Sequence, residues 1–258
     1  MQHSKIKRKK TRQISVGNVK IGGDAPIRVQ SMTNTPTPDV TATVTQIQRL
    51  QEAGCEIVRV AVPDQEAAKA VAVIKNRIDI PLIADIHFDY RLAIAAAKAG
   101  ADGLRINPGN IGALKKVKAV VDCAKDHNIP IRIGVNSGSL EKDILKKHNG
   151  VTAAGMVESG MRHVELLKSL DFDQIKISLK ASDVHRTLEA YRLLSTKTNL
   201  PLHVGVTEAG ALERRIAVEA ERRLRVLAFD ERRHPVPQSA AFELAVPGLL
   251  VSIFPGVH

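Results

Sequence analysis

Short apolar runs alternate with longer segments of helical periodicity along most of this chain. The runs are rich in Ile, Val and Leu, which is typical of parallel strands covered by helices. Seven runs are predicted to be strands, at residues 27–31, 57–62, 81–86, 103–106, 130–135, 174–179 and 201–206. The segments between them predict helices at 40–53, 65–77, 90–99, 111–127, 154–170 and 184–196. This repeated order indicates the α/β class.

The closed form of such a sheet suits the length and the repeats of this chain. The 258 residues fit a TIM-type (β/α)8 barrel, which is commonly about 250 residues long. Gly54 precedes Arg59 at the same spacing as Gly100 precedes Arg105, which suggests a repeated unit. A hairpin is predicted before the first strand, at about 13–23. We therefore expect a barrel rather than an open sheet.

Polar side chains stand where six of the predicted strands end. They are Arg59, Asp85 with His87, Arg105 with Asn107, Arg132 with Asn136, Lys180, and His203 followed by Glu208. Because the strands of a barrel end at one face, we expect these groups to share a pocket. Three arginines and a lysine outnumber the two carboxylates, so the pocket is predicted to bind a polyanion such as diphosphate.

Each of these residues also has a structural explanation when it is taken alone. A strand-end arginine can pair with a carboxylate and seal the barrel. His87 and His203 can be hydrogen-bonded structural residues, or, beside Asp85 and Glu208, acid–base or substrate-orienting groups. The excess of cations over carboxylates favours binding for the set as a whole.

Composition narrows the classes of partner. The net charge is +11, but aromatic residues make up 3% and Trp is absent, so small anions are expected rather than nucleic acid. Cys55 and Cys123 have no His or Cys at metal spacing, which suits a reducing compartment. No apolar run of membrane-spanning length and no signal core are evident, so we expect a soluble, cytoplasmic protein without membrane contact.

Six phrases of the sequence follow the predicted strands closely. They are VQSMT at 29–33, IVRVAV at 57–62, ADIHF at 84–88, LRINPGN at 104–110, RIGVNSGSL at 132–140 and GVTEAG at 205–210. These phrases resemble the 4-hydroxy-3-methylbut-2-enyl diphosphate synthase family of the bacterial two-domain type. The resemblance runs from about residue 6 to residue 210.

The resemblance implies an iron–sulfur oxidoreductase that acts on CH or CH2 groups in non-mevalonate isoprenoid (terpenoid) biosynthesis. Its reaction would be the reductive ring opening and dehydration of 2-C-methylerythritol 2,4-cyclodiphosphate. The family pairs a substrate-binding barrel with a domain that holds a [4Fe–4S] cluster. It also implies a homodimer, with ferredoxin or flavodoxin as the electron donor.

The resemblance also assigns roles to the strand-end residues. Four cations would grip the diphosphate, namely Arg59, Arg105, Arg132 and Lys180. Asn107, Asn136 and His203 would stand near them, and Asp85 and His87 would lie in the same mouth. Glu208 would be the catalytic group, either as a proton donor or by orienting a hydroxyl.

The resemblance stops abruptly after Gly210. The last 48 residues contain seven arginines and no lysine, and no cysteine follows Cys123. We therefore expect a substrate-binding barrel domain at 1–210, incomplete after its seventh strand, and a divergent tail at 211–258 without an iron–sulfur domain or metal ligands. Within the tail, 211–223 is expected to be helical, 224–229 could form a strand, and 240–254 is apolar.

A truncated or frame-shifted coding sequence would explain this break, and the chain alone is then expected to be inactive. Two other functions stay open from the sequence. One is a non-catalytic barrel fragment that binds diphosphate. The other is a barrel enzyme similar to the pterin-binding synthases, which also bind an anion at strand ends.

Overall fold

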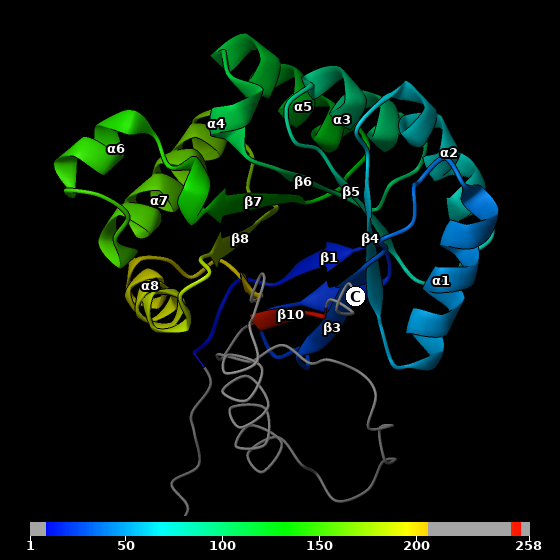
Figure 1. Cartoon of the computed structure of the whole chain (residues 1–258), viewed down its shortest axis with the longest axis horizontal. Coiled ribbons are helices and arrows are strands. Elements are labelled where there is room, and N and C mark those ends of the chain that lie inside the picture. Colours follow the sequence, from blue (N-terminus) through cyan, green and yellow to red (C-terminus); the bar gives the residue numbers. More distant parts are fainter. Residues whose placement is uncertain (1–8, 206–248, 254–258) are drawn as a thin grey trace, which may run out of the picture.

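Eight parallel strands form a closed barrel, and seven of them follow one another around it in chain order (Figure 1). The computed structural model describes residues 9–205 and, as backbone, 249–253. The barrel that the sequence predicted is confirmed. Its strands are β3 (Arg28–Met32), β4 (Ile57–Ala61), β5 (Leu82–Asp85), β6 (Gly103–Ile106), β7 (Ile131–Asn136), β8 (Ile175–Lys180), β9 (Leu202–Val204) and β10 (Leu249–Ile253).

The strand β10 takes the eighth position in the ring. It pairs in parallel with β9 on one side and with β3 on the other. This closure differs from the expectation of a barrel that is incomplete after the seventh strand. The five residues of β10 are mainly apolar and β-forming, and their pairing satisfies backbone groups on β3 and β9 that an open edge would expose. The segments 211–223 and 224–229 lie outside the described residues.

Helices form the layer around the strands (Figure 1). They are α1 (Val40–Glu52), α2 (Gln65–Lys75), α3 (Tyr90–Lys98), α4 (Pro108–Ile111), α5 (Leu114–Asp126), α6 (Lys142–Lys147), α7 (Ala153–Ser169) and α8 (Val184–Lys197), with a 3₁₀ turn η1 at Ser137–Ser139. The single helix predicted at 111–127 was wrong at its start, because Gly112 adopts a φ of 90° that ends α4 before α5 begins. No helix in the described part of the chain has the length and apolar character to cross a membrane.

Aspartate residues start four of the long helices. The Asp39, Asp64, Asp89 and Asp183 carboxylates each accept a hydrogen bond from a backbone N–H in the first turn of α1, α2, α3 and α8. Such caps satisfy donors that a helix leaves unpaired at its beginning. They fix where each helix starts after the strand that precedes it, and so define the loops at the carboxyl end of the barrel.

A two-stranded hairpin covers the opposite, amino end of the barrel. It consists of β1 (Ile14–Val16) and β2 (Val19–Ile21), joined at Gly17 with a φ of 54°. Its buried side chains form an apolar cluster with Ile57 and Ile83, which lie toward the beginnings of β4 and β5. The hairpin predicted at about 13–23 therefore seals one end of the barrel and leaves the carboxyl end for a binding site.

Candidate functional site

Four cationic side chains from four strands are buried inside the barrel. Arg59 lies on β4, Arg105 on β6, Arg132 on β7 and Lys180 on β8, and each is at most 7% exposed. The strand register aligns several of these positions, since Asp85 pairs with Arg105 and Arg105 pairs with Arg132. A charged side chain is almost never buried unless it has a partner of opposite charge. The barrel interior is therefore built to hold negative charge.

Asp85 is the carboxylate at the centre of these cations. Its Oδ1 accepts a hydrogen bond from Arg105 Nη1 at 3.0 Å, and its Oδ2 lies 3.4 Å from Arg59 Nε. Burial alone would raise the pKa of Asp85, but the charges of Arg59, Arg105, Arg132 and His87 outweigh it and lower this pKa to about 2. Asp85 is therefore ionised at neutral pH and neutralises only part of the positive charge.

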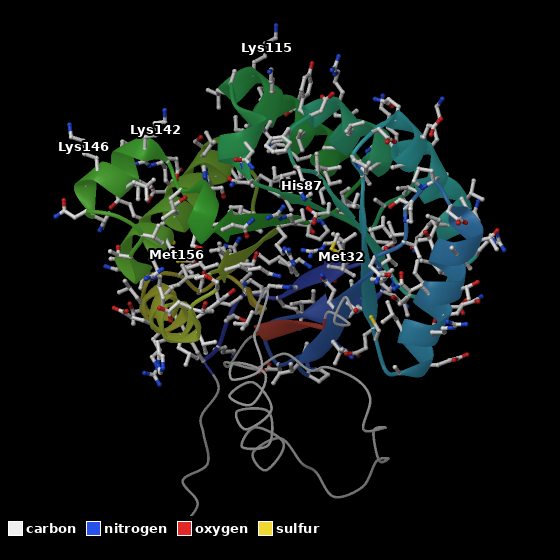
Figure 2. The ribbon with its side chains drawn as sticks, in the orientation of Figure 1. Met32, His87, Lys115, Lys142, Lys146 and Met156 are labelled. Atoms are coloured by element: carbon white, nitrogen blue, oxygen red, sulfur yellow. The ribbon has the colours of Figure 1, made fainter. Side chains whose placement is uncertain are left out.

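The side chains of His87 and Met32 extend this group toward the mouth of the barrel, and Figure 2 labels both near the middle of the ring of strands. His87 Nε2 lies 3.7 Å from Asp85 Oδ1, and the His87 side chain is 52% exposed. Arg59 Nε and Nη2 lie 3.2 and 3.0 Å from Met32 Sδ. Sulfur is a weak acceptor, so this contact orients Arg59 without neutralising it.

The deepest polar contact joins Arg132 to His203. Arg132 Nη1 donates to His203 Nε2 at 2.8 Å, which requires that nitrogen to be unprotonated. Burial and then the neighbouring cations, Arg132 first, hold the pKa of His203 well below its usual range. Burial, followed by the charges of Arg59 and Arg105, also lowers the pKa of Arg132 well below its usual value. His203 is consequently a neutral acceptor that orients Arg132.

Tyr191 of α8 fixes the position of His203. Its hydroxyl donates to the backbone carbonyl of His203 and accepts a hydrogen bond at 2.9 Å from the backbone N–H of Leu179. Tyr191 is 1% exposed, so these bonds are made away from water. One helix side chain thus links β8 to β9 beneath the two residues that form the Arg132–His203 contact.

The two asparagines predicted for the site differ in environment. Asn107 is buried, its Oδ1 accepts from the Gly109 N–H at 3.2 Å, and its Nδ2 lies 3.4 Å from Ser139 Oγ. Asn136 is exposed at the end of β7, where it pairs in register with Lys180. Asn107 therefore caps α4 and ties the β6 loop to the β7 loop. Glu208, the predicted catalytic residue, lies outside the described residues.

Lys176 is a buried cation of the site that the sequence analysis did not single out. It lies opposite Arg132 in the β7–β8 register, is 1% exposed, and its Nζ has no hydrogen-bond partner among the described residues. Burial first, and then the charges of Arg132 and Arg59, lower the pKa of Lys176 well below its usual value. Strand alternation places Lys176 on the same face of β8 as Lys180, so the sequence could have indicated it as a site residue.

Two further N–H donors inside the barrel have no hydrogen-bond acceptor in the part of the chain that the structure describes. Arg105 Nε and Arg132 Nε are buried without a hydrogen-bond partner among the described residues. Leaving such groups unpaired costs about 1–3 kcal/mol each, and more when they are charged. An anion that accepted from these N–H groups would remove that cost. The arrangement is therefore suited to binding a compact polyanion with several oxygen atoms.

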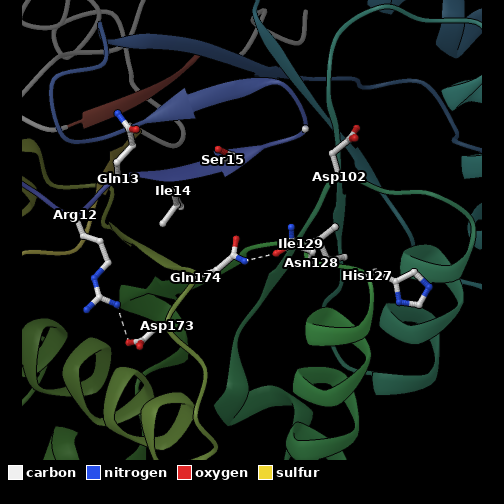
Figure 3. A pocket seen from close by; sticks show the side chains of 11 residues that line it. Arg12, Gln13, Ile14, Ser15, Asp102, His127, Asn128, Ile129, Asp173 and Gln174 are labelled. Carbon is white, nitrogen blue, oxygen red and sulfur yellow. Dashed lines mark hydrogen bonds and ion pairs between the residues drawn. The ribbon is translucent and has the colours of Figure 1, made fainter.

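A second cavity, of about 570 Å³, lies at the amino end of the barrel beside the hairpin (Figure 3). Its charged residues are already paired, because Arg12 Nη1 lies 2.7 Å from Asp173 Oδ1 and Lys75 lies 2.7 Å from Asp102. Gln174 Nε2 also donates to Asn128 Oδ1 at 2.6 Å across this cavity. It has no cluster of unbalanced cations, so the carboxyl-end group is the better candidate for an anion site.

Comparison with known sequences agrees with this geometry. Residues 11–226 match the family described as the GcpE TIM-barrel domain. The chain belongs to the GcpE family. It is 62% identical over 209 residues to the 4-hydroxy-3-methylbut-2-en-1-yl diphosphate synthase (flavodoxin) of Pseudomonas putida, covering 81% of this chain and 57% of that protein.

A second GcpE relative has a similar identity to this chain. The protein of the same name from Thermodesulfovibrio yellowstonii is 62% identical over 205 residues, which cover 80% of this chain and 59% of the relative. The chain thus spans well under two thirds of the length of these relatives. The resemblance read from the sequence is confirmed at the level of the family.

Solved structures resemble the GcpE barrel in fold alone. The dihydropteroate synthase of Xanthomonas albilineans in complex with 7,8-dihydropteroate has a TM-score of 0.54 and 15% identity, covering 80% of each chain. A truncated 3-deoxy-D-arabino-heptulosonate 7-phosphate synthase from Thermotoga maritima has a TM-score of 0.57 and 14% identity, covering 83% of this chain and 77% of that one. At these identities the function of neither enzyme transfers to this chain.

Proposed function

We propose that this barrel binds the diphosphate of 2-C-methylerythritol 2,4-cyclodiphosphate, as the substrate-binding part of a 4-hydroxy-3-methylbut-2-en-1-yl diphosphate synthase. The observation that carries the proposal is the burial of Arg59, Arg105, Arg132 and Lys180 inside the barrel, where Asp85 contacts two of the arginines. A cyclic diphosphate carries negative charge and several acceptor oxygens, which suit buried cations. The family membership supports the same ligand, because the relatives' name gives a diphosphate product.

The cations have different tasks in this proposal. Arg105 and Arg132 present planar forks with buried N–H groups, which suit two oxygens of one phosphoryl group, whereas Lys180 supplies a point charge. His203 keeps Arg132 oriented through its 2.8 Å contact. Asp85 contacts both Arg59 and Arg105 and so holds them in place before the ligand arrives. The diphosphate is thereby fixed at the barrel mouth.

Three further roles belong to the same proposal. Asn107 and Asn136 hold the loops that follow β6 and β7, and His87 offers a polar group beside the mouth. Glu208 is proposed as the proton donor or hydroxyl-orienting group of the reaction. Flavodoxin, which appears in the names of the relatives, is proposed as the electron donor, and a homodimer as the assembly.

The overall activity we propose is the reductive ring opening and dehydration of the cyclic diphosphate in isoprenoid biosynthesis. A [4Fe–4S] cluster would supply the two electrons. The cysteines of this chain do not fit such a cluster, because Cys55 and Cys123 are both buried and burial raises the pKa of the Cys55 thiol to about 11. Nor do the described residues contain a group of three or more metal ligands. In this proposal the residues described here bind and orient the substrate.

Calorimetry of the purified chain with the cyclic diphosphate tests the proposal. Binding is expected for the unmodified chain, and Arg105→Ala should weaken it about tenfold or more, the scale of a charge-assisted hydrogen bond. Arg77→Ala is the matched control, since Arg77 is exposed after α2 and should leave the affinity unchanged. Absence of binding, or an equal loss in both variants, would refute the proposed site.

Two further measurements separate the competing functions. An anaerobic assay of iron, sulfide and reductase activity distinguishes a complete reductase from a barrel that binds diphosphate without turnover. Titration with a pterin tests the likeness to the dihydropteroate synthases, and we expect no binding. If the chain bound a pterin in preference to the cyclic diphosphate, the result would favour a function like that of the pterin-binding synthases.

A further inference from the structure

We propose that Lys176 is a further anion-binding residue, whose amine takes up a proton from solvent when a diphosphate enters the barrel. The inference rests on the proposed function, since it concerns the same ligand. It extends that function from the strand-end cations to a residue deeper on β8. The step is a simple protonation, in which –NH2 becomes –NH3⁺ and no bond forms to the ligand.

The position of Lys176 supports this role. It shares a face of β8 with Ser178 and Lys180, and all three are buried inside the barrel. It pairs in register with Arg132, the residue that donates to His203. Its Nζ finds no acceptor among the described residues, so none of their carboxylates neutralises an ammonium there. A buried lysine in that position is most stable as the neutral amine until an anion is present.

Charged and titratable groups face Lys176 from five other strands and from its own strand. They are Arg59 on β4, Asp85 on β5, Arg105 on β6, Arg132 on β7, Lys180 on β8 and His203 on β9. The strand β10 contains no titratable residue. Asp85 is the one carboxylate in this set and already contacts Arg59 and Arg105. Without a bound anion, these cations therefore disfavour a positive charge on Lys176. A dianion that enters the barrel favours that charge instead.

Lys176 is a better proton acceptor than His203. The His203 Nε2 already accepts the hydrogen bond from Arg132, and protonating it would break this 2.8 Å contact. Protonation of Lys176 breaks no hydrogen bond that the described residues make. The proton that is taken up from solvent when the ligand binds is therefore assigned to the Lys176 amine.

The experiment is calorimetric titration with 2-C-methylerythritol 2,4-cyclodiphosphate at pH 8 in buffers of different ionisation enthalpy. The dependence of the measured heat on the buffer gives the number of protons taken up, and we expect about one per ligand. Lys176→Met should lose this uptake and bind several-fold more weakly. Lys142→Met is the control, because Lys142 is exposed on α6, and it should behave like the unmodified chain.

Each outcome has a distinct meaning. Binding with proton uptake that is absent from Lys176→Met supports the inference. Binding without uptake, or with uptake that persists in Lys176→Met, overturns the inference and leaves the proposed function standing. Failure of the unmodified chain to bind the cyclic diphosphate overturns both.

A measurement on the unmodified chain covers the case in which Lys176→Met does not fold. Lysine labelled with ¹³C at Cε gives one NMR signal for each of the 19 lysines. The signal of Lys176, assigned through its neighbours Ile175 and Ile177, should report a neutral amine in the free chain at pH 8. It should move to the ammonium position when the cyclic diphosphate is added. An ammonium signal in the free chain would rule out the proton uptake.

Discussion

The Arg105 guanidinium from β6 lies directly against the backbone of Gly134 on β7. A Cβ atom at Gly134 would stand 2.9 Å from Nη2 and 3.0 Å from Cζ of Arg105, closer than side chains approach one another. A side chain at this position would have to displace the guanidinium, which occupies the space beside Gly134. The small residue on β7 and the cation on β6 therefore form one structural unit of the proposed diphosphate site.

Gly134→Ala should displace Arg105 and weaken binding of the cyclic diphosphate about tenfold or more, on the scale of one charge-assisted interaction. Calorimetric titration measures this loss. Gly138→Ala is the matched control, since a Cβ there would meet nothing within 4 Å. Equal affinities for the two variants would show that the position of Arg105 does not depend on Gly134.

Asp85→Asn should destabilise the free chain by about 3 kcal/mol, because it leaves the buried cations Arg59 and Arg105 without their carboxylate. Urea unfolding followed by circular dichroism gives the change in the free energy of unfolding. Asp173→Asn provides the comparison, because Asp173 is 69% exposed in its pair with Arg12 and should change stability little. A loss below 1 kcal/mol for Asp85→Asn would argue against a central role for this carboxylate.

The stability of the chain should fall in acid partly because of Asp85. Its pKa is lowered from 3.8 to about 2 in the folded chain, so the folded state favours the ionised form. This contribution, about 2 kcal/mol, is present above pH 4 and is lost as the pH falls from about 4 to about 2. Unfolding curves across this range should show a slope that Asp85→Asn lacks. Parallel slopes for the two proteins would contradict the assignment.

Lys176→Met should stabilise the free chain, because it replaces a buried amine that has no hydrogen-bond partner among the described residues by an apolar side chain of similar length. The pKa of Lys176 is lowered in the folded chain, so the lysine destabilises folding most at low pH and least above its unfolded pKa of about 10.5. The melting temperature of the unmodified chain should therefore rise relative to that of Lys176→Met as the pH increases from 7 to 10. A constant difference would show that Lys176 is already protonated at neutral pH.

Tyr191→Phe should reduce the free energy of unfolding by about 1–3 kcal/mol, since it removes a buried hydroxyl that bonds both Leu179 and His203. Thermal and urea unfolding check this value. Tyr90→Phe, at the first position of α3, is the control and should have a small effect. If Tyr191→Phe also weakens ligand binding, then the support that Tyr191 gives to β9 extends to the Arg132–His203 contact.

Strand positions were predictable because most of the buried strands are short apolar runs that follow a Gly or a Pro. The same period-two rule placed Arg105 and Arg132 inside the barrel. The rule applied equally to Lys176. This residue lies near the beginning of β8, whereas the predicted site residues were all taken from the ends of strands. Contacts such as Arg132 with His203 depend on side-chain conformations across the barrel, and strand periodicity does not determine these.

Two other differences have local causes. Gly112 divides a segment of continuous helical periodicity, because its backbone adopts a φ of 90° that hydrophobic periodicity does not report. Asn136 shares its strand face with Arg132, but it is the last residue of β7 and lies beyond the covered part of the barrel. Alternation therefore gives the direction of a side chain, while its depth depends on how far the loops rise above the strand.

The hairpin at the amino end restricts how molecules move through this protein. Ile14, Val16 and Ile21 close that end by packing against Ile57 and Ile83, beneath the layer of cations. Within the described residues, a ligand held by Arg105 and Arg132 has to leave by the same opening through which it entered. Ligands must then enter and leave through this one opening in turn, so any group that covers the barrel mouth controls both steps.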